Sequence, residues 1–258
     1  MTRIPDNAAA SPFEARVASH GYQELMDLMK SRHSVRSFDD RPIEGETLAE
    51  LEREIAWCNA QAGLSIQLVR DNPEAFDGAL AKYGSFRNVR NHFALIGPKG
   101  ASLDERCGYY GERLVLLSQS LELNTCWVAL TFRKGGSAAQ VGEHEKFALC
   151  IAVGYGTDQG KAHKVKPVEQ LCRVPEPPRS GSGEIPSWFT AGMNAAQLAP
   201  TAMNQQRFRF ELEAPADHTP LVRAVALPAL SCGKIDLGIA KLHFELGANT
   251  VSKEWRFT

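Results

Sequence analysis

Apolar side chains in the first two thirds of the chain recur at two different spacings. Leu25, Leu28 and Met29 share one helical face in a segment that begins near residue 20 and ends in the cationic stretch 32–38, which predicts a helix. The same approach predicts helices at 45–57 and 108–123 and strands at 65–71, 92–97, 125–130 and 147–153. Helices and strands therefore alternate through this part of the chain.

The apolar pattern breaks and then partly repeats. Residues 171–185 are rich in Pro, Gly and Ser and have no apolar period, which predicts a linker. Beyond it the pattern predicts a helix at 188–198, strands at 207–213 and 222–228, and a helix at 236–248.

The order helix, strand, strand, helix thus occurs twice. The segments 112–124 and 236–249, which contain the last helix of each repeat, can be overlaid approximately, with Leu121–Asn124 opposite Glu245–Ala248. A degenerate internal duplication is the hypothesis that this order favours. We expect a first half at 20–170 and a second, shorter half at 186–258, with both halves forming one compact unit.

The charge balance bears on the class of partner. The chain has 258 residues, with 29 Lys and Arg against 30 Asp and Glu and a formal net charge of −1. No global field favours nucleic acid or an anionic membrane, so a small molecule is the expected partner. No apolar run approaches the ~20 residues of a membrane span, and the first residues lack the order of a signal peptide, so we expect a cytoplasmic protein.

The cysteines and histidines do not form a ligand pattern. Six cysteines are scattered without C-x-x-C spacing, and the seven histidines show no H-x-x-x-H or H-x-E pattern. We expect neither a metal site nor a redox disulfide, and we interpret several cysteines as small core residues in a reducing compartment. For His243, a hydrogen-bonded structural role is favoured over a ligand contact, because no partner for a ligand role can be named.

The stretch RHSVRSF at 32–38 gathers groups that bind anions. If the segment is extended, Arg32, Ser34 and Arg36 share one face, and two guanidinium groups with a hydroxyl suit a phosphate monoester. The alternative is a solvated basic helix end, in which arginine complements the helix dipole.

A second stretch, AQLAPTAMNQQRFRF at 196–210, contains a tight turn. Pro200 interrupts what is otherwise a good helix, and Thr201 and Asn204 follow where their side chains can bond free backbone groups or a ligand. A turn with satisfied caps is the alternative to a ligand site.

These stretches carry a family resemblance. RHSVRSF is similar to the R-R-S-x-R-x-F opening of the nitroreductase family, and APTAMNQQRFRF is similar to its A-P-S-x-x-N-x-Q-P-W-x-F motif. The segments ERLVLLSQSLELNTCWVAL, FALCIAVGYG and DLGIAKLHFEL also resemble family segments, so the matches span most of residues 30–250. The resemblance implies an α+β nitroreductase-like fold with an antiparallel sheet core flanked by helices.

In the ordinary family FMN binds at a homodimer interface, whereas this chain resembles single-chain members that look like an internally fused dimer. The resemblance therefore implies a monomeric pseudo-dimer with one FMN per chain, with further association left open. The residues that it places at FMN form four groups: Arg32, His33, Ser34 and Arg36 at the phosphate and ribityl chain; Pro200, Thr201 and Asn204 at the ring or ribityl chain; Thr125, Cys126 and Trp127 with backbone near the ring; Lys164 and Lys166 near the phosphate. Core packing is the alternative for the Trp127 side chain.

The chain departs from the family pattern at identifiable positions. Glu122-Leu123-Asn124-Thr125 stands where the family has Gly-Leu-Gly-Thr, which replaces two flexible backbone positions near the flavin. Gln206 and Arg207 stand where Pro and an aromatic residue are expected. Each half has only part of a site.

The implied function is an FMN-dependent oxidoreductase that uses NAD(P)H to reduce a nitroaromatic, quinone or similar small acceptor. The cofactor performs the hydride chemistry, so no protein acid or base is assigned. Two alternatives stay open. One is a non-catalytic FMN-binding or regulatory protein with the same fold, which the altered Glu122–Thr125 loop allows; the other is a purely structural or interaction protein.

Overall fold

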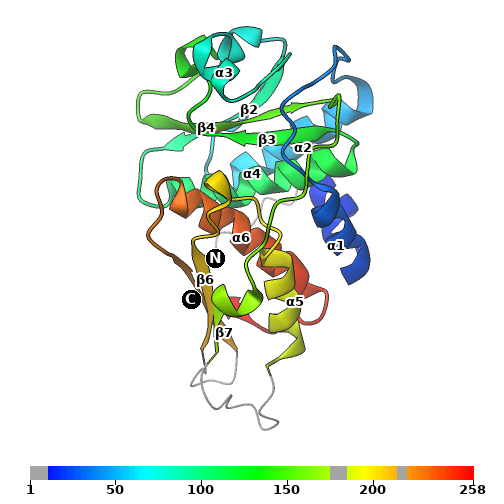
Figure 1. Ribbon diagram of the computed structural model, residues 1–258, viewed down its shortest axis with the longest axis vertical. Helices are drawn as coiled ribbons and strands as arrows, with labels where there is room; N and C mark the ends of the chain where they lie inside the picture. Colours follow the sequence, from blue (N-terminus) through cyan, green and yellow to red (C-terminus); the bar gives the residue numbers. More distant parts are fainter. Residues whose placement is uncertain (1–10, 175–184, 214–219) are drawn as a thin grey trace. The chain divides into compact units, whose positions relative to one another are not determined.

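The computed structural model describes residues 11–174, 185–213 and 220–258 (Figure 1). Packing divides the chain into two units, each described here by itself. Unit 1 contains the described part of Met1–Ser19 with Arg32–Leu103 and Arg113–Ala162; unit 2 contains His20–Ser31, Asp104–Glu112 and the described part of His163–Thr258. The division into halves expected from the sequence stays a prediction, and residues 175–184 of the predicted linker lie outside the described residues.

Unit 1 is built on a fully antiparallel sheet. Its strands are β1 (Gln67–Val69), β2 (Asn91–Pro98), β3 (Asn124–Val128) and β4 (Glu145–Gly154), in the order β1-β2-β4-β3. The central strands β2 and β4 are apolar along most of their length and buried on both faces. The helices α2 (Gly45–Ala62) and α4 (Leu103–Ser120) lie on one side of the sheet in Figure 1, and α3 (Ala79–Tyr83) lies on the other.

The side of the sheet that faces α3 carries an aromatic core. Phe76 makes edge contacts with Phe86 and His92 and stacks near Phe132, with ring centres 5.2, 5.8 and 6.1 Å apart. The short turns η2 (Pro73–Phe76) and η3 (Lys134–Gly136) hold these rings against the sheet. Burial of several aromatic rings together is a large apolar contribution to stability.

A buried charge cluster ties the N-terminal π-helix η1 (Glu14–Ala18) to unit 1. The Arg113 guanidinium donates to Glu54 Oε1 at 2.9 Å and lies over the rings of Phe13 and Trp57, 4.2 and 4.1 Å from their centres. Ser11 Oγ donates to the other Glu54 oxygen at 2.5 Å. Both charged side chains are almost fully buried, and the several hydrogen bonds to the carboxylate offset the cost of removing it from water.

Unit 2 combines three whole helices and the first part of α4 with a mixed sheet. The helices are α1 (Tyr22–Ser31), α5 (Ser187–Ala196) and α6 (Gly233–Asn249). The sheet has the order β5 (Cys172–Arg173), β6 (Phe208–Glu213), β7 (Leu221–Ala226), β8 (Arg256–Phe257), of which β6 and β7 pair antiparallel while both outer strands are parallel additions. The predicted α+β class with antiparallel sheets is confirmed, and the two-residue outer strands were too short to predict from periodicity.

Two glycines allow the first part of α4 to approach α6 closely. A Cβ added at Gly108 would lie 2.1 Å from the carbonyl oxygen of Ile235, and a Cβ at Gly238 would lie 2.1 Å from that of Glu105. The contacts are reciprocal, because each glycine faces the carbonyl oxygen of the residue three positions before the other glycine. This register differs from the overlay drawn from the sequence, and the duplication itself stays a prediction.

One predicted element needs correction. The helix expected to continue into the cationic stretch ends at Ser31, and residues 32–38 are extended. Val35 and Phe38 are 0% and 4% exposed, and isolated bridges join Ser34 to Thr125 and Phe38 to Gly156. The bridges replace the helical hydrogen bonds, and burial of these two side chains stabilises the extended backbone.

Candidate functional site

The extended segment 32–38 runs beside the edge strand β3. Val35 N donates to the Thr125 carbonyl oxygen at 3.0 Å, and Ser34 pairs with Thr125 as a parallel bridge. Successive side chains of extended backbone point to opposite sides, so Arg32, Ser34 and Arg36 share a face. This is the arrangement that the extended-segment interpretation predicts.

Arg32, Ser34 and Arg36 all lie close enough to the Cys126 thiol to affect its ionisation. Burial raises the pKa of this thiol, whereas the positive charge of Arg36, a hydrogen bond with Ser34 and the positive charge of Arg32 act in the opposite direction. The structure therefore brings four of the residues predicted from the sequence to one place. Arg32 is only 5% exposed and lies outside the helix, so a solvated helix end does not describe it.

His33 lies on the opposite side of the segment and has a different environment. Its Nδ1 lies 2.9 Å from the Gln159 carbonyl oxygen, which can only accept, so Nδ1 donates. The Asn124 side chain joins the same loop, because its Nδ2 donates to Gln159 Oε1 at 3.1 Å and its Oδ1 accepts from Gly156 N at 3.0 Å. The loop that follows β4 thus holds segment 32–38 against β3.

The two departures from the family glycines have distinct structural consequences. Asn124 supplies the side chain that fixes the loop after β4. Glu122 has φ +61°, a left-handed conformation that glycine adopts without cost and that is unfavourable for a residue with a Cβ. The chain therefore keeps the backbone conformation of a glycine position while carrying a glutamate there.

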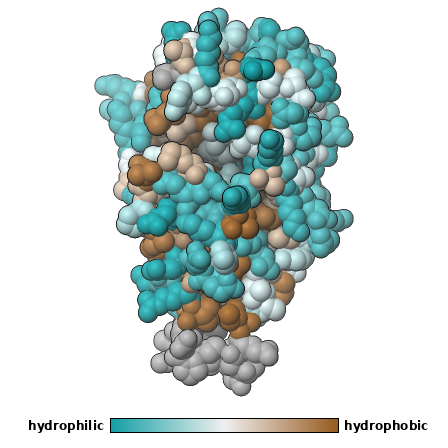
Figure 2. Space-filling model, viewed as in Figure 1, coloured by the Kyte–Doolittle hydropathy of each residue, from teal (hydrophilic) through white to brown (hydrophobic). Residues whose placement is uncertain are grey.

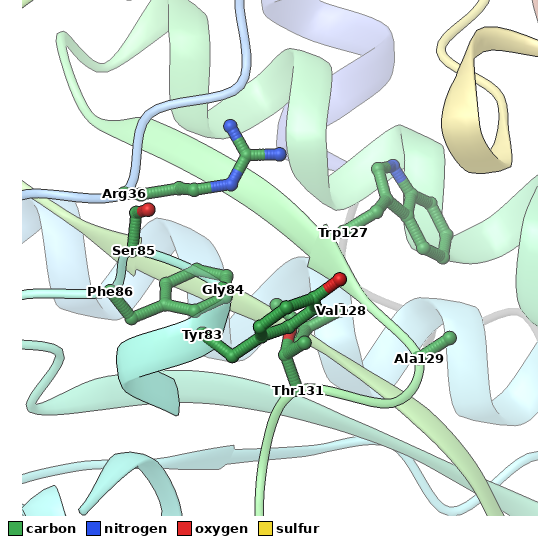
Figure 3. A pocket seen from close by; sticks show the side chains of 9 residues that line it. All are labelled: Arg36, Tyr83, Gly84, Ser85, Phe86, Trp127, Val128, Ala129 and Thr131. Carbon is green, nitrogen blue, oxygen red and sulfur yellow. The ribbon is translucent and has the colours of Figure 1, made fainter. Parts of the chain in front are cut away.

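A pocket of about 390 Å³ opens beside Arg36 in unit 1 (Figure 3). Figure 3 shows the Arg36 guanidinium and the Trp127 indole in the upper part of the view and the rings of Tyr83 and Phe86 below them. Arg36 Cζ lies 5.9 Å from the centre of the Phe86 ring. The remaining lining residues are small or hydroxyl-bearing: Gly84, Ser85, Val128, Ala129 and Thr131.

The chemistry of this pocket suits a planar ligand that carries negative charge. Three aromatic rings offer apolar faces, one guanidinium offers charge and paired donors, and no carboxylate lines the pocket. Trp127 is half-buried and lines the pocket, so its side chain is not a core residue. Tyr83 and Phe86 were not predicted from the sequence, where their only signal is two aromatic residues around a glycine.

The residues predicted from the second stretch form a self-contained turn in unit 2. Gln206 N donates to Thr201 Oγ1 at 3.0 Å, and Asn204 Nδ2 donates to the Lys164 carbonyl oxygen at 2.8 Å. Lys166 Nζ donates to the carbonyl oxygens of Gln205 and Gln206 at 2.6 and 3.1 Å. These contacts match the capped-turn alternative, and the roles of these residues at a cofactor stay predictions.

The backbone of this turn is unusual. After the buried Pro200, the short helix η5 (Ala202–Asn204) and the residues around it include three left-handed conformations, with φ of 51° at Met203, 53° at Asn204 and 46° at Gln206. Each costs free energy in a residue other than glycine, and such strain persists only where the surroundings fix it. The side-chain and lysine contacts of the turn are among the restraints that fix it.

His243 has the structural role that the sequence favours. It is fully buried on α6, with Nδ1 3.1 Å from the Ala195 carbonyl oxygen and Nε2 2.9 Å from Glu112 Oε1. Both ring nitrogens therefore have partners, and the pair joins α4, α5 and α6. This confirms the interpretation of His243 as a hydrogen-bonded core residue.

The described residues contain neither a metal-ligand cluster nor a helix that could cross a membrane. No group of three or more His, Cys, Asp or Glu side chains in this part of the chain could hold a metal ion, and no disulfide joins its cysteines. No helix among the same residues is long and apolar enough to cross a bilayer. Figure 2 shows hydrophilic residues over most of the face in view, with apolar residues in small groups between them.

Comparison with known proteins places the chain in a family. The family described as "Putative TM nitroreductase" matches residues 24–248. A "putative nitroreductase" from Thermotoga maritima is 18% identical with a TM-score of 0.56, and the alignment covers 88% of this chain and 85% of that one. No curated protein matches the chain closely enough to count as a relative.

Two further solved structures resemble about half of the chain. A "Putative NADH dehydrogenase/NAD(P)H nitroreductase" from Parabacteroides distasonis is 20% identical with a TM-score of 0.45, covering 57% of this chain and 95% of that one. A "putative nitroreductase in complex with FMN" from Desulfovibrio desulfuricans is 16% identical with a TM-score of 0.45, covering 57% and 94%.

The family match extends over most of the chain and confirms the resemblance carried by segments 32–38 and 196–210. The Thermotoga maritima structure supports the same fold over most of both chains. The chain belongs to the nitroreductase family.

Proposed function

We propose that the chain is an FMN-dependent oxidoreductase that uses NAD(P)H to reduce a nitroaromatic, quinone or similar small acceptor. The observation that carries the proposal is the shared face of Arg32, Ser34 and Arg36 on the Cys126 side of segment 32–38, beside an aromatic pocket. Membership of the nitroreductase family supports the same conclusion.

The donor set of unit 1 fits a phosphorylated flavin. A phosphate monoester carries nearly two negative charges, and guanidinium groups bind it through paired, charge-assisted hydrogen bonds. Arg32 is buried, so its position is fixed before a ligand binds, whereas Arg36 is exposed and can follow the ligand. Ser34 adds a neutral donor between them.

Bound FMN would supply the hydride chemistry, accepting a hydride from NAD(P)H and passing electrons to a second molecule. The protein's part is to bind and orient. Arg36 and Trp127 border the pocket, and the rings of Tyr83 and Phe86, which also line it, would pack against a flat molecule. No protein acid or base is assigned, because the cofactor performs the difficult step.

The second unit has a proposed part in the same function. Pro200, Thr201 and Asn204 would line the flavin, with Lys164 and Lys166 nearby, so that each chain holds one FMN as a monomeric pseudo-dimer. The reciprocal contacts of Gly108 and Gly238 support this view, because reciprocal contacts are what a two-fold relation between equivalent helices produces.

A second candidate is a non-catalytic FMN-binding or regulatory protein. The left-handed Glu122 favours it, since a glutamate side chain replaces a glycine next to the loop that the family uses near the flavin ring. Both candidates predict bound FMN. They differ in whether NAD(P)H reduces it.

Replacing Arg36 tests the proposed phosphate site. Arg36→Gln removes a charge-assisted contact worth about 1.5–3 kcal/mol, so the Kd for FMN should rise by at least about tenfold in a fluorescence titration. Arg53→Gln is the matched control, because Arg53 belongs to the same unit and pairs with Glu46 on the exposed face of α2. Equal FMN affinity in both variants would count against the site.

Asn204→Ala tests the contribution of unit 2 separately. If the turn lines the cofactor, this variant should also weaken FMN binding, whereas an unchanged Kd would restrict the cofactor site to unit 1. The Arg36 result is independent of this outcome.

A further inference from the structure

Asp236 is a buried carboxyl group beside the strained turn of unit 2. It lies in the first turn of α6 and is 2% exposed. Its Oδ1 accepts a hydrogen bond from Ala202 N at 3.0 Å, at the first residue of η5. Its Oδ2 is buried and has no hydrogen-bond partner within the described residues.

Charged groups on the neighbouring elements are exposed or have other partners. On α6, Lys234 is exposed, and Lys241 pairs with Glu105 of α4 at 2.8 Å. After the turn, Arg207 Nε donates to the Pro228 carbonyl oxygen at 2.7 Å, and residues 201–206 contain no charged side chain. The pKa of Asp236 responds to burial and to the hydrogen bond from the Ala202 amide.

Ionisation of this carboxyl group is unfavourable. Burial raises its pKa from 3.8 to about 7, although the hydrogen bond from Ala202 N acts in the opposite direction. A buried carboxylate needs two or three donors or a cation, and one amide is insufficient. The neutral form is the one that the surroundings accommodate.

The turn that Asp236 holds is strained and depends on restraints. Its left-handed residues Met203, Asn204 and Gln206 are stable only while contacts outside the turn fix them. Cys232, just before α6, is also left-handed, with φ 59°. The hydrogen bond from Ala202 N to Asp236 joins this turn to α6.

We propose that Asp236 is a pH-dependent positioning residue, which holds turn 201–206 against α6 as a neutral carboxyl group and releases it as a carboxylate. The release follows because the carboxylate gains solvation when the turn moves away and admits water. The consequence for the cofactor rests on the proposed function: if the turn lines FMN, the protein holds FMN less tightly as the pH rises above about 7.

Hydrogen exchange on the full chain tests the proposal without reference to FMN. Protection of the amides in peptides that cover 198–206 is measured from about pH 6 to about pH 8.5 and corrected for the intrinsic pH dependence of exchange. The wild-type protein should lose protection above pH 7, approaching about tenfold per pH unit. Asp236→Asn keeps an oxygen that can accept from Ala202 N and cannot ionise, so its corrected protection should not change with pH.

Asp77→Asn is the control, because Asp77 is an exposed carboxylate in unit 1 and its variant should keep the wild-type profile. Identical profiles for the wild type and Asp236→Asn would overturn the proposal. Should Asp236→Asn fold poorly, the carbon-13 shift of the wild-type Asp236 carboxyl group decides instead: titration near pH 7 supports the proposal, and titration near 3.8 overturns it.

The same variants separate this proposal from the proposed function. If both hold, the Kd of the wild-type protein for FMN rises above pH 7 and that of Asp236→Asn does not. If the protein fails to bind added FMN at any pH, the proposed function is wrong, while the exchange profile still decides the role of Asp236.

Discussion

His92 makes unit 1 sensitive to acid. The residue lies on β2 with its side chain fully buried, Nε2 2.8 Å from Ser137 Oγ and its ring against Phe76. Nδ1 is buried and has no hydrogen-bond partner among the residues described. Burial lowers the pKa of His92 from 6.5 to about 4, so the folded protein holds this imidazole neutral over a range in which the unfolded chain protonates it.

The sign and size of the effect follow from these two pKa values. A depressed folded pKa contributes stability that is present above pH 6.5 and is lost as the pH falls toward 4. At 1.36 kcal/mol per pKa unit the full loss is on the order of 3 kcal/mol, and roughly 2 kcal/mol of it is lost between pH 7 and pH 4.5. Asp236 acts in the opposite direction over the same range, so variants must be compared with one another.

The assay is chemical denaturation at about pH 7 and about pH 4.5 for the wild type, His92→Gln and His144→Gln. His92→Gln removes the titrating group, so its free energy of unfolding should fall by roughly 2 kcal/mol less than that of the wild type on acidification. His144 is exposed, and His144→Gln should follow the wild type. Equal losses in the wild type and His92→Gln would refute the reasoning.

Two further predictions concern packing and buried charge. Gly108→Ala places a Cβ 2.1 Å from the facing carbonyl oxygen and should destabilise the protein by about 1–3 kcal/mol or more. Gly100→Ala, whose added Cβ has nothing within 4 Å, should change stability by less than about 0.5 kcal/mol. Thermal unfolding of both variants checks this, and equal melting temperatures would contradict it. Arg113→Met leaves the buried Glu54 without its cation and should lower the free energy of unfolding by about 3–5 kcal/mol in chemical denaturation. The exposed control Arg53→Met should lower it by less than about 1 kcal/mol. A small effect at Arg113 would show that the buried pair contributes little to stability.

Periodicity predicted the larger elements because they bury one apolar face. The helices α1, α2, α4, α5 and α6 and the strands β1–β4, β6 and β7 all fall on segments with helical or strand spacing. The elements β5, β8 and α3 have two to five residues and are too short to show a period. The cationic stretch 32–38 was ambiguous, because Val35 and Phe38 are spaced as on a helix, and only the bridges to distant segments show that it is extended.

The candidate site was predictable where the residue types themselves have few roles. Two arginines and a serine at alternate positions predict an anion site once the backbone is extended, and the structure places all three near Cys126. Tyr83 and Phe86 were missed because pocket lining depends on tertiary placement.

Asp236 was missed for a different reason. An aspartate in the first turn of a helix is usually interpreted as a favourable partner of the helix dipole. The burial of Asp236 depends on the fold around it and leaves no signal in the sequence. The left-handed conformations at Met203, Asn204 and Gln206 were equally inaccessible, because no glycine marks them.

The central claim is that this chain binds FMN and that NAD(P)H reduces it. The direct measurement is anaerobic mixing of the FMN-loaded protein with NADH and, separately, with NADPH, while the visible absorbance of the flavin is followed. We expect the flavin to bleach with at least one donor and to recover its absorbance when a nitroaromatic or a quinone is added. A flavin that stays oxidised with both donors would contradict the account and would favour the non-catalytic FMN-binding alternative.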